Sequence, residues 1–286
     1  MASLIDEELD QLRCEVDRID RALVELLADR LRTVREIARI KAPTANGRPA
    51  IRPGREAVIL RRLVEQAGTR FPAGTLVRMW RELLAATTRV QAPLAIAAYA
   101  PPDRPELWDL ARDHFGSTVP LHRTASASRA LRLVADGAVD LAVLPLPAED
   151  EGWWAGLLDM SARPLRVVAK LPFGPPGPLL GGSGAMVVGA IPTEPTGSDL
   201  SLLAVETPAG VGRERLLNLL SAAGLAARRL ASLRPSDGRA MLHLLELDGF
   251  IGPEDTRLAR ALAAARELVL RSAWLGGYAR PLPASD

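Results

Sequence analysis

The chain of 286 residues is 48% hydrophobic and 24% charged, which is enough apolar sequence for one large core or several small ones. Its net charge is only +2, and its single cysteine excludes a disulfide framework and a cysteine-based metal site. No apolar run reaches the roughly 18 residues that cross a bilayer, and the acidic amino terminus lacks the apolar segment of a signal peptide. We therefore expect a globular, cytoplasmic protein that does not bind membranes.

The first 92 residues have the periodicity of three amphipathic helices, which we place at 8–42, 55–67 and 73–91. Prolines and turn-forming residues follow the first and third of these helices. The first helix is too long to bury its apolar face against the other two alone. An interlocked dimer, in which two copies share these faces, is therefore the expected assembly.

The first helix places cations within its own apolar stripe. At about 100° per residue, Arg30 and Lys41 fall in the arc of the apolar side chains. The apolar members of this stripe are Leu12, Val16, Ile19, Leu23, Leu26, Val34 and Ile37. An unpaired charge in a core costs several kcal/mol, so these cations need acidic partners or an anionic ligand in a cavity.

Further polar residues share these inner faces. Thr87 and Gln91 lie four positions apart on the third helix, and Glu56 lies on the apolar face of the second. Arg13 lies about 90° from the stripe of the first helix, where it could reach a partner's site. A snorkelling arginine or a structural Arg–Glu pair would explain any one of these positions. Together they favour a positively charged pocket for a small dianion.

After Pro93 the pattern changes to strands alternating with helices. We expect a small parallel α/β lobe over 93–172, a linker and a strand over 173–198, and a ferredoxin-like βαββαβ domain over 199–286. The expected fold class is thus multi-domain, with an all-α amino-terminal domain of residues 1–92 and two α/β units. The three histidines are scattered without the spacing of metal ligands.

Three stretches of the helical region resemble the all-helical chorismate mutases, especially the mutase domain fused to prephenate dehydratase in bacterial bifunctional enzymes. They are LRCEVDRIDRALVELLADRLRTVREIARIK, IRPGREAVILRRL and MWRELLAATTRVQ. The resemblance implies that Arg30, and Arg13 of the partner subunit, hold the two carboxylates of chorismate, with Thr87 assisting. It also implies that Lys41 and Gln91 donate to the ether oxygen of the breaking bond.

The same resemblance assigns the remaining site residues. Glu56 would accept a hydrogen bond from the ring hydroxyl. Arg52 is counted among the substrate-binding residues, although some family members have an aspartate there as a second partner of the hydroxyl. The rearrangement of chorismate to prephenate has no nucleophile and no proton transfer, so we expect neither cofactor nor metal. Catalysis must then come from holding a compact conformer and stabilising charge on the ether oxygen.

The second region resembles a degenerate prephenate dehydratase. The stretch VADGAVDLAVLPLPAEDEG matches a dehydratase pattern, but its Glu-Asn-Ser is replaced at residues 147–149. The Thr-Arg-Phe motif that supplies the catalytic threonine of that family aligns with Gly-Ala-Met at 184–186. We therefore expect the dehydratase activity to be lost.

The last region resembles the ACT domain of those enzymes, most clearly in LASLRPSDG and WLGGYARP. Its ligand-binding motifs are altered at 209–212 and 232–235, which favours a structural or dimerising role over phenylalanine binding. An amino-acid effector and a shikimate-pathway enzyme are the further partners considered for it.

The sequence thus predicts a homodimeric chorismate mutase of phenylalanine and tyrosine biosynthesis. One alternative is an enzyme that also dehydrates prephenate, and another is a non-catalytic ACT-type regulatory protein. Nucleic-acid binding is not expected, because aromatic residues are only 4% of the chain and its basic residues lie partly on an apolar stripe.

Overall fold

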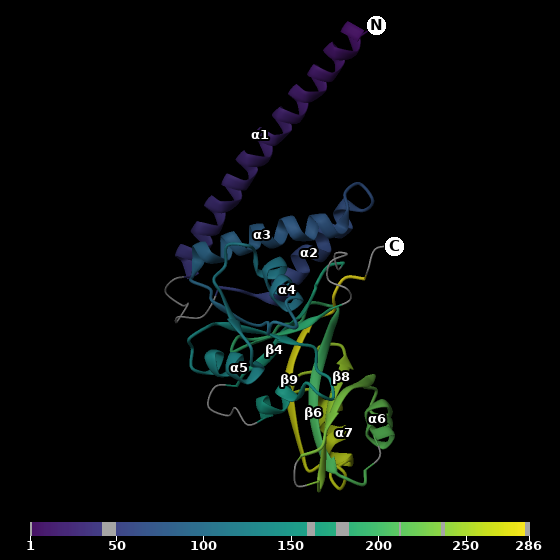
Figure 1. Cartoon of the computed structure of the whole chain (residues 1–286). Coiled ribbons are helices and arrows are strands. Elements are labelled where there is room, and N and C mark those ends of the chain that lie inside the picture. Colours follow the sequence, from purple (N-terminus) through teal and green to yellow (C-terminus); the bar gives the residue numbers. More distant parts are fainter. Residues whose placement is uncertain are drawn as a thin grey trace.

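The computed structural model describes residues 2–41, 50–158, 164–175, 183–211, 213–235 and 238–283. The amino-terminal part is helical, and its first helix extends well beyond the rest of the molecule (Figure 1). The remainder is a mixed α/β region built on a long twisted sheet (Figure 1). None of the helices in the described part of the chain is long and apolar enough to cross a membrane.

Three helices form the amino-terminal region, as predicted: α1 (Ala2–Lys41), α2 (Pro53–Ala67) and α3 (Ala73–Gln91). Helix α2 begins at Pro53, two residues before the predicted start, because proline at a first helical position needs no hydrogen-bond partner for its nitrogen. Helix α1 begins six residues before its predicted start and reaches Ala2. The turn predicted after α1 lies outside the described residues.

The apolar face of α1 is bare in a single chain. Large apolar side chains along its length are exposed, and Leu26 and Ile40 keep 64% and 69% of their surface accessible. The others are Ile5, Leu9, Leu12, Val16, Ile19, Leu23, Val24, Leu27 and Ile37. Helix α3, in contrast, buries Val77, Leu84 and Ala85. A contiguous exposed apolar surface of this length marks an interaction site.

The next segment has the predicted alternation of strands and helices. Its elements are β1 (Ile96–Tyr99), α4 (Glu106–Phe115), β2 (Leu121–Thr124), α5 (Ala127–Ala135) and β3 (Leu141–Pro145). Strand β1 pairs in parallel with β2 and with β3. The helical connections supply the long crossovers that parallel neighbours require.

Two elements here were not predicted: the 3-10 helix η2 (Gly152–Leu158) and strand β4 (Arg166–Leu171). Strand β5 (Ala185–Gly189) is the strand expected in the linker segment, and it runs antiparallel between β3 and β4. All five residues of β5 are buried. The expected linker itself lies partly outside the described residues, since 176–182 are not described.

The last segment has the predicted order of strands and helices. It comprises β6 (Asp199–Pro208), α6 (Arg213–Ala222), β7 (Ala227–Leu233), β8 (Ala240–Asp248), α7 (Thr256–Ala264) and β9 (Arg271–Ala279). The strands lie in the order β9-β6-β8-β7, and each neighbouring pair is antiparallel. One cluster buries side chains of α6 and α7 with those of β6 and β8, so both helices cover the same face.

A single sheet joins the two α/β segments, in the order β2-β1-β3-β5-β4-β9-β6-β8-β7. The joint is between β4 and β9, where Val167 pairs in parallel with Gly276. Gly276 has φ +134°, and a Cβ there would lie 2.2 Å from the Val167 carbonyl oxygen, so only glycine fits this approach. The predicted boundaries after residues 92, 172 and 198 remain predictions, but the last two divide elements that share a sheet.

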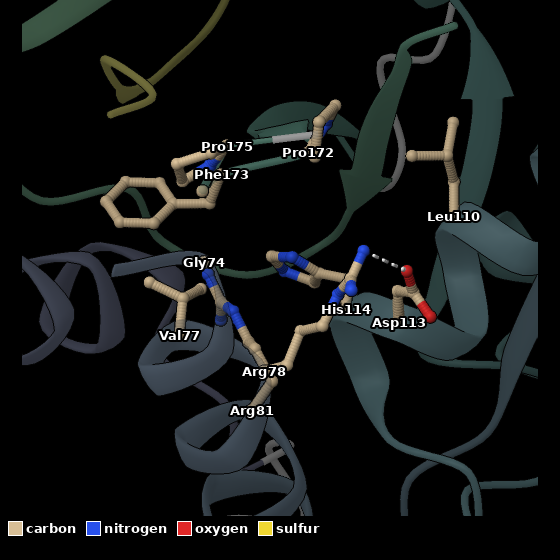
Figure 2. A pocket seen from close by; sticks show the side chains of 11 residues that line it. Gly74, Val77, Arg78, Arg81, Leu110, Asp113, His114, Pro172, Phe173 and Pro175 are labelled. Carbon is tan, nitrogen blue, oxygen red and sulfur yellow. Dashed lines mark ion pairs between the residues drawn. The ribbon is translucent and has the colours of Figure 1, made fainter. Parts of the chain in front are cut away.

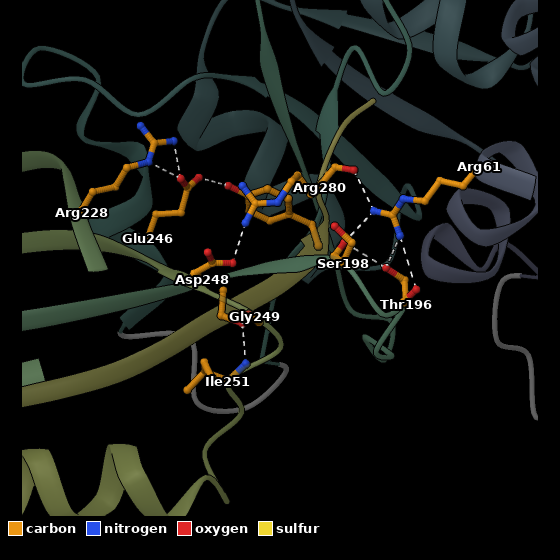
Figure 3. A network of polar contacts seen from close by, with 11 residues as sticks. Arg61, Thr196, Ser198, Arg228, Glu246, Asp248, Gly249, Ile251 and Arg280 are labelled. Atoms are coloured by element: carbon orange, nitrogen blue, oxygen red, sulfur yellow. Dashed lines mark hydrogen bonds and ion pairs between the residues drawn. The ribbon is translucent and has the colours of Figure 1, made fainter. Parts of the chain in front are cut away.

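Helix α2 is tied to the sheet region by polar contacts. Arg61 donates to Thr196 Oγ1 at 2.8 Å and to the carbonyl oxygens of Ser198 and Arg280 at 2.6 and 2.8 Å (Figure 3). Its guanidinium also lies 5.7 Å from the ring centroid of Phe173, which packs in a core cluster with residues of α2 and α3. The helical region is therefore docked on the sheet by a half-buried arginine and a shared core.

Candidate functional site

The first element of the candidate site is the contact between α1 and α3. Arg30 is half-buried, and its Nη1 donates to Thr87 Oγ1 at 3.4 Å. Burial lowers the pKa of Arg30. The Thr87 hydroxyl is buried and donates to the Leu83 carbonyl oxygen at 2.9 Å, which leaves a lone pair free to accept from Arg30. The predicted cation of the apolar stripe thus meets the predicted threonine.

Gln91 completes this group one turn further along α3. Its Nε2 donates to the Thr87 carbonyl oxygen at 3.2 Å, and the side chain is partly buried. The structure therefore brings Arg30 and Thr87 into contact between α1 and α3, and Gln91 lies one turn further along α3. Two donors and a hydroxyl at a half-buried junction can recognise a carboxylate or another electronegative oxygen.

Glu56, predicted to face a ligand, is paired with an arginine that the sequence analysis missed. Arg81 Nη1 donates to Glu56 Oε2 at 2.8 Å, and the two side chains are only 4% and 12% exposed. Burial raises the pKa of Glu56, and the positive charge of Arg81 opposes that rise. The sequence signal that identified Arg30, a charged residue on the apolar face of a helix, could also have identified Arg81. Arg81 lies on the buried face of α3 with Val77 and Leu84.

Arg13 and Lys41 lie at a distance from Arg30 along the same helix. Arg13 is exposed and pairs with Asp10 at 2.9 Å. It precedes Arg30 by seventeen positions, which is roughly 25 Å along a helix axis, so it cannot reach the Arg30 site of its own chain. Lys41 is the last residue of α1, about 16 Å from Arg30 along the axis, and it is exposed.

Arg52 has a contact that the predicted substrate-binding role did not include. Its Nη2 lies 2.5 Å from Glu194 Oε2, and Glu194 Oε1 accepts from the Arg55 amide at 3.1 Å. The carboxylate of Glu194 therefore sits at the amino terminus of α2, where the helix dipole favours an anion. Arg52 thus takes part in docking α2 against the loop that follows β5.

The described residues contain no group of three or more His, Cys, Asp or Glu side chains placed to hold a metal ion. What they contain is a helical region with one long unpartnered helix and with half-buried cations and amides facing inward. The described chain thus has a helical region with a half-buried arginine between two helices, followed by a mixed α/β region on one sheet.

The helical region is similar to a known protein family. Residues 12–92 match the family model for chorismate mutase type II. The chain is 30% identical over 149 residues to a bifunctional chorismate mutase/prephenate dehydratase of Pseudomonas aeruginosa, and equally to that of Stutzerimonas stutzeri. Each alignment covers 51% of this chain and 40% of the relative. Residues 12–92 are thus similar to the chorismate mutase type II family, and the chain is similar to part of bifunctional enzymes that carry both mutase and dehydratase activities.

The similarity to these relatives extends beyond the helical domain, because an alignment of 149 residues is longer than the span 12–92. The chain spans about two fifths of the length of the curated relatives that it matches. Among solved structures, the prephenate dehydratase of Arthrobacter aurescens in complex with L-Phe superimposes with a TM-score of 0.49 at 17% identity. That superposition covers 67% of this chain and 93% of the other.

Proposed function

We propose that this protein is a homodimeric chorismate mutase that converts chorismate to prephenate, the activity named in its bifunctional relatives. The observation that carries the proposal is the Arg30–Thr87–Gln91 group at the junction of α1 and α3, within the segment that matches the mutase family. We also propose a cytoplasmic location.

In the proposed reaction the carbon–oxygen ether bond breaks as a new carbon–carbon bond forms within one molecule. No atom or proton is exchanged with the protein, so its side chains act by position and charge. Arg30 would hold one carboxylate, with Thr87 fixing the guanidinium. Arg13 of the partner subunit would hold the other carboxylate, since the Arg13 of the same chain is too far away.

The ether oxygen gains negative charge only in the transition state, so donors placed there raise kcat more than they raise affinity. We assign this role to Lys41 and Gln91. Gln91 is an amide and donates without being protonated first, so this contact does not require acidic pH. One carboxylate oxygen of Glu56 accepts a hydrogen bond from Arg81, and the other would accept a hydrogen bond from the ring hydroxyl of the substrate.

The bare apolar face of α1 supports the homodimer. Eleven large apolar side chains are exposed in the part of α1 whose side chains the structure describes. Their contact with water is unfavourable unless another surface covers them. A second copy offers the same stripe, and it would bring its Arg13 to the site of the first copy. Dimerisation would then complete the site and bury the apolar stripe at the same time.

We also propose that the α/β region has lost dehydratase activity. The positions that align with the catalytic threonine motif fall at Gly184 and in β5, where Ala185 and Met186 are 0% and 1% exposed. No hydroxyl is available at these positions, and the strand is packed between β3 and β4.

The last segment has the element order and strand order of a ferredoxin-like fold, which supports the assignment of an ACT-like domain. The altered motif at 209–212 lies partly outside the described residues. We propose a structural role for this domain, and an amino-acid effector or another enzyme of the pathway remains the partner to be tested.

The decisive experiment measures loss of chorismate absorbance with the purified protein and then assays phenylpyruvate before and after acid treatment. Prephenate that yields phenylpyruvate only after acid establishes a mutase without dehydratase activity. Phenylpyruvate formed without acid would show the bifunctional enzyme. A folded dimer that leaves chorismate unchanged would refute the mutase and favour the regulatory protein.

A further inference from the structure

Arg81 is a buried charge that the proposed reaction does not use directly. It lies at the base of the helical domain, where its guanidinium pairs with Glu56 at 2.8 Å and is 5.4 Å from the ring centroid of Phe173. Figure 2 shows Arg81 extending from α3 towards Phe173, whereas Arg78 of the same helix points to Asp113. Phe173 belongs to the sheet region, so one arginine joins the two parts of the molecule.

A structural role alone accounts poorly for this pair. Removing two charges from water costs several kcal/mol per ion, and apolar residues of similar size often replace a buried ion pair without loss of stability. The pair does, however, fix the carboxylate in one orientation, because an arginine fork is planar and rigid. It also opposes the rise in the pKa of Glu56 that burial causes.

Arg81 is positioned to act on a ligand through Glu56. Its side chain is only 4% exposed, and its Nη1 donates to the Glu56 carboxylate at 2.8 Å. Phe173, His114 and Pro172 line a cavity beside it. We therefore expect the effect of Arg81 on a bound ligand to pass through the Glu56 carboxylate.

We propose that Arg81 is a positioning residue for the mutase reaction, which holds the Glu56 carboxylate toward the substrate while the Phe173 ring of the sheet region braces its guanidinium. This inference rests on the proposed function. It gives the α/β region a part in the mutase site, since Phe173 follows β4 and touches both Arg81 and Arg61.

The test is a double-mutant cycle in the full-length protein, with R81M measured in the wild-type and in the E56Q background. We expect R81M to lower kcat/KM roughly 100-fold in the wild type, chiefly through KM, because a misplaced carboxylate loses a ground-state contact. In E56Q the same change should cost less than about threefold, since the group through which Arg81 acts is already altered. R81K keeps the charge without the fork and should recover part of the loss.

The matched control is R78M, which removes an arginine from the same helix and the same cavity lining. Arg78 is 53% exposed and lies 3.7 Å from Asp113, so its loss should leave kcat/KM within about twofold. F173L removes the ring from the guanidinium and should reproduce a smaller part of the R81M effect. Melting curves of each variant show that the compared proteins are folded, and R81K replaces R81M in the cycle if R81M does not fold.

Equal losses from R81M in both backgrounds would overturn the positioning role and leave the mutase assignment in place. A wild-type protein that does not convert chorismate would overturn both. A loss confined to the wild-type background, with partial recovery in R81K, supports the proposal.

Discussion

Helices α1 and α3 have similar apolar periodicity but opposite surroundings. Helix α3 buries its inner face against α2, α4 and the segment after β4, whereas α1 leaves its stripe exposed along most of its length. The same pattern thus belongs to an intrachain core in one helix and to a face that the chain leaves exposed in the other. Amphipathicity indicates a face that favours burial, but it does not show what covers that face.

Charges placed on the α1 stripe should produce the largest effect. In the double variant V16D/L23D, two carboxylates would enter the proposed subunit interface, where an unpaired buried charge is strongly unfavourable. We expect a monomer and loss of nearly all mutase turnover, measured by sedimentation equilibrium and chorismate consumption. C14D introduces a carboxylate on the exposed opposite face and should stay dimeric. A dimeric, active V16D/L23D would show that the stripe is not the interface.

Lys41→Ala tests whether the end of α1 serves catalysis instead of assembly. We expect kcat to fall roughly 100- to 1000-fold, because a donor to the developing oxyanion is lost, while the melting temperature and the dimer are retained. Arg39→Ala removes an exposed cation of the same turn, which pairs with Glu36, and should leave kcat unchanged. Full turnover in a folded Lys41→Ala dimer would remove Lys41 from the site.

Leu84→Ala probes the buried face of α3, the other side of the comparison. Leu84 is 7% exposed, so its truncation should lower the free energy of unfolding by roughly 2–5 kcal/mol, measured by urea denaturation. Val90→Ala, an exposed position on the same helix, should cost less than about 0.5 kcal/mol. If Leu84→Ala changed only the dimer affinity, α3 would be part of the interface too.

His114, on the neighbouring helix α4, should make a smaller and pH-dependent contribution to the free energy of unfolding. Burial, with a lesser contribution from the charge of Arg81, holds the pKa of His114 well below its ordinary value of 6.5. The folded protein then binds this proton less well than the unfolded chain, so stability is full above pH 6.5 and declines as the pH falls below it. We expect His114→Gln to reduce this decline, which for one group cannot exceed about 1.4 kcal/mol per pH unit, in melting curves between about pH 5 and 7. An unchanged slope would show that His114 does not titrate differently on folding.

Much of the fold could be predicted from the sequence because most elements are amphipathic and bounded by turn residues. The ends of α3 and the parallel β1–β2–β3 unit follow from such local signals. Strand β4 escaped prediction because its apolar run has no period-2 alternation that would distinguish it from a loop or a helix. The pairing of β4 with β9 joins residues far apart in the chain and has no local signal.

The candidate site was predictable in part for the same reason. Arg30 and Thr87 were found because a charge and a hydroxyl interrupt apolar stripes, and the structure places them in contact. Arg81 interrupts a stripe as well, but its partner depends on how α2 packs against α3, which periodicity does not specify. The pairing of Arg52 with Glu194 depends on a loop 142 positions away.

The β4–β9 pairing at Gly276 determines how the α/β region unfolds. Because β4 and β9 share hydrogen bonds and a buried cluster spans both sides of the joint, neither half can lose its strands without exposing the other's core. We therefore expect the segments 96–189 and 199–279 to unfold cooperatively in one transition, with coincident fluorescence and circular dichroism curves. Two segments that resemble separate modules in sequence would then form one cooperative unfolding unit.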